Sequence, residues 1–270
     1  MEKFTFQPLL QLLLGCLCAA AIAYAAYRAG SLSRSGAWGA LLEGTIIFGL
    51  GGWRWAVILL AFFVSSSALT RLNAKRKAAL AAKFEKGGQR DIGQVLANGG
   101  VASLFAGLHF FFPQASWTWM AFAASLAAVN ADTWSTELGV LNPSMPRLIT
   151  SGKPVERGTS GGISLYGSLA AVGGAALIAI LAGLVRPVGN FWVIAGIASL
   201  GGLLGSLFDS LLGATVQAIY RCPQCDKETE KYPLHSCGTE TIQVRGWKWL
   251  DNDMVNLGCA VIGAVIGIIV

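Results

Sequence analysis

Long apolar runs alternate with polar connections along this chain of 270 residues. Several runs approach the roughly 20 residues that an α-helix needs to cross a bilayer. They predict an all-α, polytopic transmembrane bundle of about seven or eight spans, forming one domain over residues 1–270. We expect helices at about 8–28, 37–51, 53–70, 93–112, 116–133, 161–185, 191–219 and 254–270. The second is short and rich in glycine, so it could be tilted, re-entrant or merged with the third.

The composition and the placement of charge fit a membrane protein. Hydrophobic residues make up 54% of the chain and charged residues 13%, which is too apolar for an ordinary soluble domain. Almost all Lys and Arg residues lie in or beside every second loop, at 29–36, 71–92, 134–160 and 220–253. Only Lys3, Arg54 and Arg186 fall on the other side. The positive-inside rule therefore places these loops in the cytoplasm and both termini outside. If the second segment does not span, the N-terminus changes sides but these loops do not.

The net charge of +6 does not indicate nucleic acid as a partner, because the basic residues follow membrane topology. Residues 71–88 alternate Ala and Leu with Lys and Arg. This pattern predicts a basic helix on the inner leaflet that contacts anionic membrane lipids, although a solvated connector would have the same composition. Whether the protein forms a homo-oligomer stays open from the sequence. We expect an integral protein of the inner or plasma membrane if the source is bacterial or archaeal.

Polar chemistry is concentrated between two apolar segments, from Asn130 to Gly167. Asp132 and Glu137 lie at the end of the fifth predicted helix, where acidic groups are costly and rarely idle. Their oxygen atoms suit Mg²⁺, which usually binds together with phosphates. The following loop, 134–160, holds the cations Arg147, Lys153 and Arg157.

A glycine-rich turn ends this stretch and consists of Gly158, Thr159, Ser160, Gly161 and Gly162. Such a turn at a helix N-terminus binds anions through free backbone N–H groups and the helix dipole. The stretch therefore predicts a site for a magnesium-bound polyphosphate at the membrane surface. The alternative is close helix packing by small residues beside ordinary cytoplasmic cations.

Other polar residues fall at the same predicted membrane face. Asp209 is a carboxylate inside an otherwise apolar helix, which predicts a metal or cation partner, or else a packing hydrogen bond to a neighbouring Ser. Further polar residues at the inner helix ends are Gln94, Asn98, Asn130, Asp251, Asn252, Asp253 and Asn256. Because they converge beside the cationic loop, we expect them to line one site.

The loop 220–253 carries Cys222, Cys225, His235 and Cys237 with the spacing C-x2-C-x9-H-x-C. Three thiolates and an imidazole suit a tetrahedral, structural Zn²⁺. Free thiols are equally ordinary on the reducing side of a membrane. We expect zinc, where it binds, to act only as a staple for this loop.

Four motifs carry a resemblance to a known family: QVLANGG, NADTWSTELG, PRLITSGKPVERGTSGG and WLDNDMVN. They resemble the integral-membrane family that includes the plastid phytyl-phosphate kinase of vitamin E (tocopherol) synthesis. That family is distantly similar to dolichol kinase and CDP-diacylglycerol synthase. The resemblance implies a CTP-dependent kinase that converts a prenyl monophosphate to the diphosphate, with the lipid phosphate and a nucleotide triphosphate as partners.

Within this hypothesis Mg²⁺ is held by Asp132 and Asp209, with Glu137 as a third ligand or behind them. Lys153 and the Gly158–Gly162 turn bind the nucleotide phosphates, while Arg147 and Arg157 clamp either the nucleotide or the acceptor. The residues proposed as catalytic are Asp132, Lys153 and Asp209. The remaining polar set, from Gln94 to Asn256, completes the substrate side.

Three other functions stay open from the sequence. A CDP-lipid-forming cytidylyltransferase or a dolichol-type lipid kinase would use the same residues. A transporter of an anionic solute would also contain broken glycine-rich helices and buried carboxylates. Against the transporter, no internal repeat is evident and the polar groups lie to one side of the membrane.

Overall fold

The computed structural model describes residues 7–77, 88–186 and 189–270, and eight α-helices make up most of this part of the chain. They are α1 (Gln7–Arg28), α2 (Arg34–Ile46), α3 (Trp53–Lys77), α4 (Ile92–Phe111), α5 (Ser116–Gly139), α6 (Leu165–Val185), α7 (Phe191–Thr215) and α8 (Asn252–Ile269). A π-helical turn, η1 (Ile47–Gly51), extends α2. The prediction of an all-α membrane protein is confirmed. Helices α3 and α5 run about two turns beyond their predicted ends.

Five helices are long and apolar enough to cross a membrane by length and composition: α1, α3, α6, α7 and α8. The predicted number of spans was higher. Helices α4 and α5 contain 20 and 24 residues and are not among these five, and both carry polar residues such as Asn98 and Asp132. Helix α2 contains only 13 residues before η1 begins. The short second segment expected from the sequence is therefore present, while the number of spans stays a prediction.

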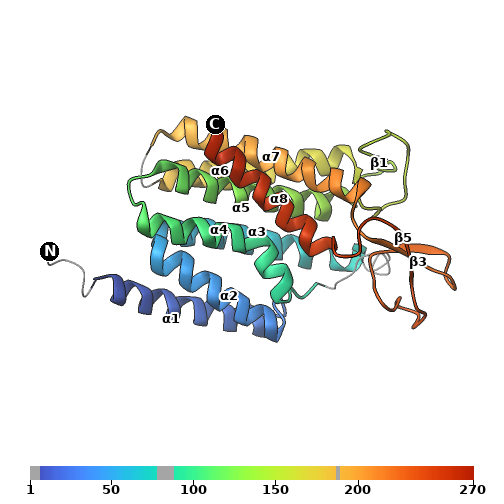
Figure 1. Ribbon diagram of the computed structural model, residues 1–270, viewed down its shortest axis with the longest axis horizontal. Helices are drawn as coiled ribbons and strands as arrows, with labels where there is room; N and C mark the ends of the chain where they lie inside the picture. The colour runs from blue at the N-terminus through green and yellow to red at the C-terminus, as the bar shows by residue number, and fades with distance from the viewer. Residues whose placement is uncertain (1–6, 78–87, 187–188) are drawn as a thin grey trace.

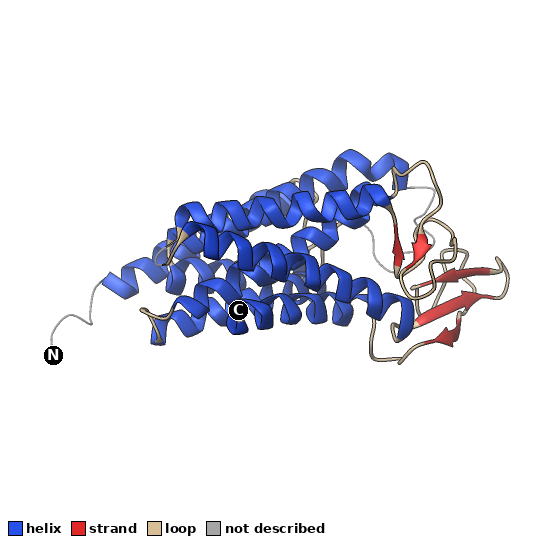
Figure 2. Cartoon of the chain, turned by 90° about the horizontal axis from the view of Figure 1, so that it is seen from above, coloured by secondary structure: helices blue, strands red, loops and turns tan. Residues whose placement is uncertain are grey.

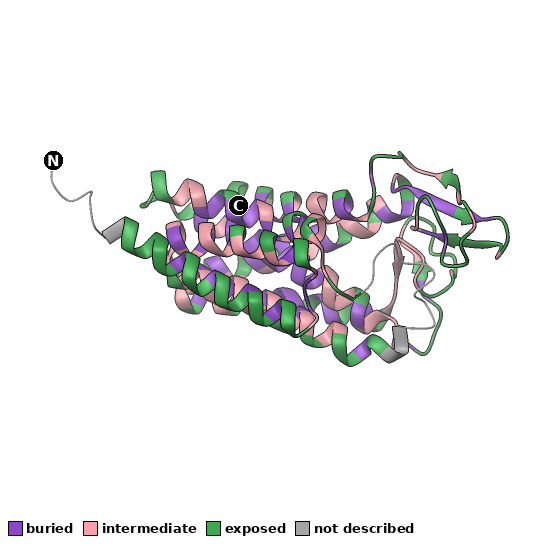
Figure 3. Cartoon of the chain, turned by 90° about the horizontal axis from the view of Figure 1, so that it is seen from below, coloured by how far each residue is buried: buried purple, intermediate pink, exposed green. Residues whose placement is uncertain are grey.

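Helix α5 lies at the centre of the bundle. Every residue from Ala121 to Ala131 is buried, and α5 packs against α3, α4, α6, α7 and α8 (Figures 1 and 3). Helices α1 and α2 form a hairpin that contacts α4 and leaves much of α1 exposed. Because other helices surround α5, its polar residues meet protein groups.

Small residues set the distance between α5 and α7. A Cβ atom added at Gly201 would lie 2.9 Å from the Cβ of Ala124, and one at Gly205 would lie 2.5 Å from the Cβ of Ala128. Small residues let the backbones of membrane helices approach closely. Both pairs advance by four residues on each helix, so α5 and α7 run parallel in a fixed register.

All strands lie at one end of the bundle, away from the start of α1 (Figures 1 and 2). The loop after α5 contains the antiparallel strands β1 (Arg147–Leu148) and β2 (Gly162–Ile163). The loop after α7 forms a three-stranded sheet in the order β4-β3-β5, with β3 at Ile219–Cys222, β4 at Lys227–Thr229 and β5 at Ile242–Arg245. We call residues 219–245 the β module; its strands were not predicted.

The predicted basic helix at 71–88 falls partly outside the described residues. Its first part continues α3 as far as Lys77, and positions 78–87 are among those not described. The proposed contact of this segment with the inner leaflet stays a prediction.

We expect Gly205→Ala to destabilise the protein by about 1–3 kcal/mol, because the new Cβ would overlap Ala128 and push α7 away from α5. The matched control is Gly196→Ala on the same helix, where a Cβ meets no described heavy atom within 4 Å. Since Ala is the better helix former, that control should be neutral or slightly stabilising. Unfolding of the detergent-solubilised proteins measures both. Equal effects of the two substitutions would refute the close-packing argument.

Candidate functional site

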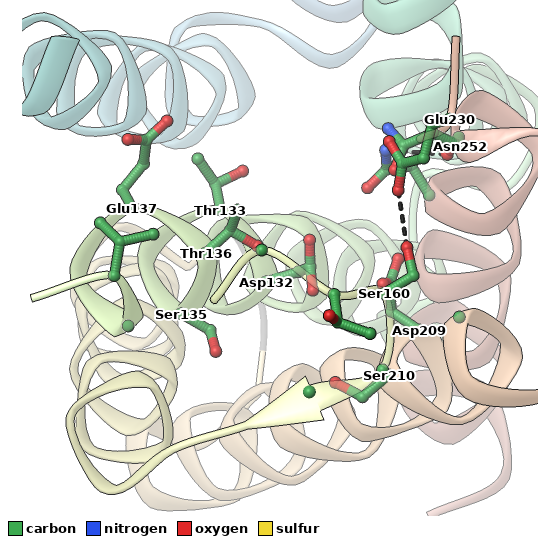
Figure 4. A pocket seen from close by; sticks show the side chains of 18 of the residues that line it. Asp132, Thr133, Ser135, Thr136, Glu137, Ser160, Asp209, Ser210, Glu230 and Asn252 are labelled. Carbon is green, nitrogen blue, oxygen red and sulfur yellow. Dashed lines mark hydrogen bonds between the residues drawn. The ribbon is translucent and has the colours of Figure 1, made fainter. Parts of the chain in front are cut away.

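A polar cavity of about 410 Å³ opens at the end of the bundle that carries the strands. Its walls come from α3, α4, α5, α7, α8, the glycine-rich turn and the β module. Figure 4 shows that its labelled side chains are mainly carboxyl and hydroxyl groups. The polar residues predicted to converge therefore meet at one place, apart from those considered below.

Asp132 of α5 and Asp209 of α7 both point into this cavity and interact electrostatically (Figure 4). Their closeness follows from the register of the two helices. Each aspartate lies four residues beyond the contact between Ala128 and Gly205, which is about one turn. Two carboxylates at this separation repel each other unless they share a proton or a cation lies between them. Their oxygen atoms, from two helices, are the donors that Mg²⁺ prefers.

Glu137 lies away from this aspartate pair. Its Oε1 accepts a hydrogen bond of 2.8 Å from Thr70, and it interacts electrostatically with Arg90. The five residues from Asp132 to Glu137 turn the side chain by about 140° around α5. Glu137 is therefore not grouped with the two aspartates as the predicted third ligand.

Glu230 of the β module is the third carboxylate beside Asp209, and the sequence analysis missed it. Its Oε1 accepts hydrogen bonds from the Ser160 hydroxyl at 2.6 Å and from the Gln217 amide at 3.0 Å. It also interacts electrostatically with Asp209. Figure 4 places Glu230 and Glu137 at opposite sides of the cavity.

Arg90 supplies a cation to the cavity. From the sequence, this arginine was used only to predict the membrane topology. Its backbone pairs with the segment after α1, where its N–H donates to Ser31 O and its carbonyl accepts from Ser33 N, both at 3.0 Å. Its guanidinium lies 5.5 Å from the centre of the Phe62 ring. Burial lowers the pKa of Arg90 to about 10, and Glu137 opposes this shift, so the group stays charged at neutral pH.

The glycine-rich turn forms part of the cavity wall, because Gly158, Thr159, Ser160, Gly161 and Gly162 all line it. The φ angles of Gly158 and Gly161 are +78° and +79°, values that favour glycine. A Cβ at Gly161 would lie 2.4 Å from the backbone N of Ala214. The turn was predicted to lie directly at the start of α6, but it does not. Its last residue, Gly162, begins strand β2, and α6 begins only at Leu165 with Ser164 as its N-cap.

Of the three predicted loop cations, Arg157 lies among the described residues that line the cavity, and Arg147 and Lys153 do not. Arg157 donates hydrogen bonds to the carbonyls of Asn142 and Pro143 at 2.9 and 2.8 Å. Arg147 and Lys153 are exposed in and beside the small β1–β2 sheet. Leu148 N donates to Lys153 O at 2.9 Å and holds this turn outward. The predicted nucleotide contacts of Arg147 and Lys153 have no support from this placement.

Four predicted substrate-side residues line the cavity: Gln94, Asn98, Asn252 and Asn256. Asp251 is exposed and instead caps α8, accepting a hydrogen bond of 3.0 Å from Met254 N. Asp253 is buried and lies outside the lining of the cavity.

Asn130 is also separate from the cavity, because it is fully buried inside the bundle. Its Oδ1 accepts hydrogen bonds of 3.1 Å from the hydroxyls of Ser65 and Ser66. Its amide donates to the Gly174 carbonyl at 2.8 Å. This residue therefore joins α3, α5 and α6, and its role is to stabilise the bundle.

A second cavity, of about 320 Å³, lies between α1, α2, α3 and α4 and is almost entirely apolar. It adjoins the polar cavity, because Arg90, Gln94 and Asn98 line both. Glu43 of α2 also lines it and is 5% exposed. The sequence analysis missed Glu43, although a single acidic residue in an apolar helix is a signal for function.

The predicted Cys and His residues of the β module come together. One ligand atom from each of Cys222, Cys225, His235 and Cys237 lies within 4.8 Å of the others. Hydrogen bonding with Thr239 and His235 lowers the pKa of Cys237 to about 5, whereas hydrogen bonding with Cys237 raises that of Cys225 to about 11. The group lies outside the wall of the polar cavity.

We expect Asn130→Ala to destabilise the protein by about 1–3 kcal/mol, because Ser65, Ser66 and the Gly174 carbonyl would lose their buried partner. Asn98→Ala is the control, since the Asn98 amide donates to Gln94 O of its own helix. Unfolding in detergent should show a clear loss for the first variant and a small one for the second. A stable Asn130→Ala protein that loses only substrate binding would contradict the structural role.

Comparison with known proteins shows where this sequence belongs. It matches the family described as integral membrane protein DUF92 over residues 17–264. It is 33% identical to Protein PGR of Arabidopsis thaliana over 271 residues, which is 92% of each chain. It is 30% identical to the uncharacterized membrane protein MJ0933 of Methanocaldococcus jannaschii, over 100% of this chain and 98% of that one. No solved structure matches it significantly.

A more distant relative is the chloroplastic Protein VTE6 of Arabidopsis thaliana. The identity is 27% over 247 residues, which cover 88% of this chain and 65% of the relative. Relatives thus come from an archaeon and a plant, and one of them is a chloroplast protein.

Proposed function

The chain belongs to the integral membrane protein DUF92 family, and we propose that it acts as a CTP-dependent prenyl-phosphate kinase. In this proposal it converts a phytyl-like monophosphate to the diphosphate at the cytoplasmic side of the membrane. The observation that carries the proposal is the junction between the polar and the apolar cavity.

The junction suits a substrate with a charged head and a long apolar tail. The apolar cavity offers α1, α2 and α3 side chains to a prenyl chain, and the polar cavity begins where Arg90, Gln94 and Asn98 line both. The Arg90 guanidinium is placed to bind the lipid phosphate, since guanidinium groups bind phosphate through two hydrogen bonds. A soluble nucleotide alone would not need the apolar half.

The remaining polar groups fit a nucleotide triphosphate with its metal. In the proposal Asp132 and Asp209 hold Mg²⁺, which when bound neutralises phosphate charge. The glycine-rich turn and Arg157 bind the nucleotide phosphates through backbone N–H groups and a fixed positive charge. Glu230 keeps Ser160 in place through its hydrogen bond.

In the proposed reaction the protein mainly has to position the lipid phosphate and CTP. A terminal oxygen of the lipid monophosphate attacks the γ-phosphorus of CTP, the bond to the β-phosphate oxygen breaks, and CDP leaves. Since the attacking oxygen is already anionic, no strong general base is required. The family resemblance of the motifs supports CTP as the donor. The Arg90 guanidinium and the adjoining apolar cavity support a lipid phosphate as the acceptor.

The decisive experiment uses purified full-length protein, labelled CTP and phytyl monophosphate in mixed micelles. We expect CDP and the lipid diphosphate as products. Asp132→Asn and Asp209→Asn should each lower the rate about a hundredfold or more, because each removes a charge that faces the metal. Both variants should still fold, as checked by gel filtration in detergent.

Other products would give other answers. Pyrophosphate with a CDP-lipid would identify a cytidylyltransferase. Consumption of CTP with an unphosphorylated prenyl alcohol would identify a lipid kinase of the dolichol type. No turnover, together with uptake of an anionic solute into proteoliposomes, would favour a transporter.

Two cations of one loop provide a sharper test of the site. We expect Arg157→Ala to weaken CTP binding by roughly 1.5–3 kcal/mol, or about ten- to a hundredfold, through loss of a charged phosphate contact. Lys153→Ala is the matched control and should change affinity by less than about 0.5 kcal/mol, as is usual for exposed side chains. Titration of each variant with CTP measures both. A larger effect at Lys153 would mean that the nucleotide binds along the outer turn.

A further inference from the structure

We infer that Cys222, Cys225, His235 and Cys237 bind one zinc ion, and that this ion fixes the segment that carries Glu230 into the polar cavity. The inference is independent of the proposed kinase activity, because it rests on the geometry of the β module and on the hydrogen bonds of Glu230. It goes beyond the loop staple expected from the sequence, since it links the metal to a residue of the cavity.

The first half of the site is a compact turn between β3 and β4. Cys222 ends β3 and is buried, and Cys225 lies three residues later. The backbone N–H of Cys225 donates to the Cys222 sulfur at 3.4 Å, and Asp226 N donates to Cys222 O at 2.9 Å. Asp226 has a φ angle of +53°, which lets the chain turn back sharply after the second cysteine. Such a turn presents two sulfur atoms and a backbone donor to one point.

The second half comes from the connection between β4 and β5. His235 is 6% exposed, and its Nδ1 lies 3.2 Å from the Cys237 sulfur. A tight turn holds the pair, in which His235 N donates to Thr239 O and Gly238 N donates to His235 O, both at 2.9 Å. The Cys237 sulfur lies 3.5 Å from that of Cys222, so the two halves face each other.

These separations suit a tetrahedral zinc site. Zinc binds sulfur at about 2.3 Å, which places two sulfur ligands of a tetrahedron about 3.8 Å apart. The four ligand atoms lie within 4.8 Å of one another, close to that requirement. Three sulfurs and one imidazole complete four ligands, as in structural sites. A buried imidazole and three thiols also leave no open position for a substrate.

The ion would join the two ends of the segment that contains Glu230. Two ligands precede this residue and two follow it, and Glu230 comes directly after Thr229, the last residue of β4. Its carboxylate then reaches Ser160 of the glycine-rich turn and Gln217 after α7. A three-residue strand orders little by itself, so a metal that joins both ends of the segment would restrict where Glu230 lies.

The test is elemental analysis of freshly purified full-length protein, prepared under reducing conditions without chelators. We expect about one zinc ion per chain. Cys222→Ser and Cys237→Ser should each lose most of it, whereas Cys16→Ser, on α1, should retain it. Because a variant can lose metal by failing to fold, unaltered protein exchanged with Co²⁺ should also show the absorption of a tetrahedral cobalt–thiolate centre. Hydrogen exchange after chelation should rise at residues 226–237 and stay constant in α5.

Several results would overturn the inference. Iron in place of zinc would refute the identity of the ion. Absence of any metal, together with a disulfide between Cys222 and Cys237 by mass spectrometry, would refute the site. Unchanged exchange around Glu230 after zinc removal would refute the positioning role and leave a metal site without a link to the cavity.

Discussion

The close contact of α7 with α5 is the constraint on which the candidate site depends. Gly201 meets Ala124, Gly205 meets Ala128, and the next turn of both helices brings Asp209 beside Asp132. The small residues at these first two contacts let the two helix backbones approach closely, and this close packing fixes the register of α7 against α5. One turn further along, the same register places the carboxyl groups of Asp132 and Asp209 together, although their like charges would otherwise keep them apart. Their mutual repulsion is offset by packing along the same interface, and a bound cation would remove it.

The same arrangement explains why polar residues are tolerated in α5. This helix is surrounded by five others, so its polar side chains meet protein groups and not lipid. Asn130 is hydrogen-bonded to two hydroxyls and a carbonyl. Asp132 lies two residues later, about half a helical turn, and faces the cavity. Helices α7 and α8 contribute Asp209 and Asn252 to the cavity and are still apolar enough overall to cross a membrane.

The helices could be predicted from the sequence because apolar runs of membrane length leave few alternatives. The Asp132 and Asp209 pair could be suspected, since acidic residues in apolar helices are rare. The positions of Glu137 and Lys153 could not be predicted. Glu137 lies at the other side of the cavity from Glu230, where it accepts a hydrogen bond from Thr70, and Lys153 lies beside the β1–β2 sheet and outside the residues that line the cavity. Both outcomes depend on tertiary contacts that no local pattern contains. Glu230 was missed for the same reason, because it enters the cavity from a sheet after α7.

The distribution of charge around the cavity gives the proposed reaction a direction. Figure 4 shows Asp132 between Glu230 on one side and Glu137 on the other. Glu230 accepts a hydrogen bond from Ser160 of the glycine-rich turn, whereas Glu137 interacts electrostatically with the cation Arg90, so the two sides differ in charge. Among the described residues, the apolar cavity adjoins the Arg90 side, where Arg90, Gln94 and Asn98 line both cavities. A lipid phosphate would therefore enter beside Arg90, and a nucleotide beside the turn, with the aspartate pair between them. Phosphoryl transfer requires the attacking and leaving oxygens to lie on opposite sides of the phosphorus, and in the proposed reaction this separation of the two substrates would meet that requirement.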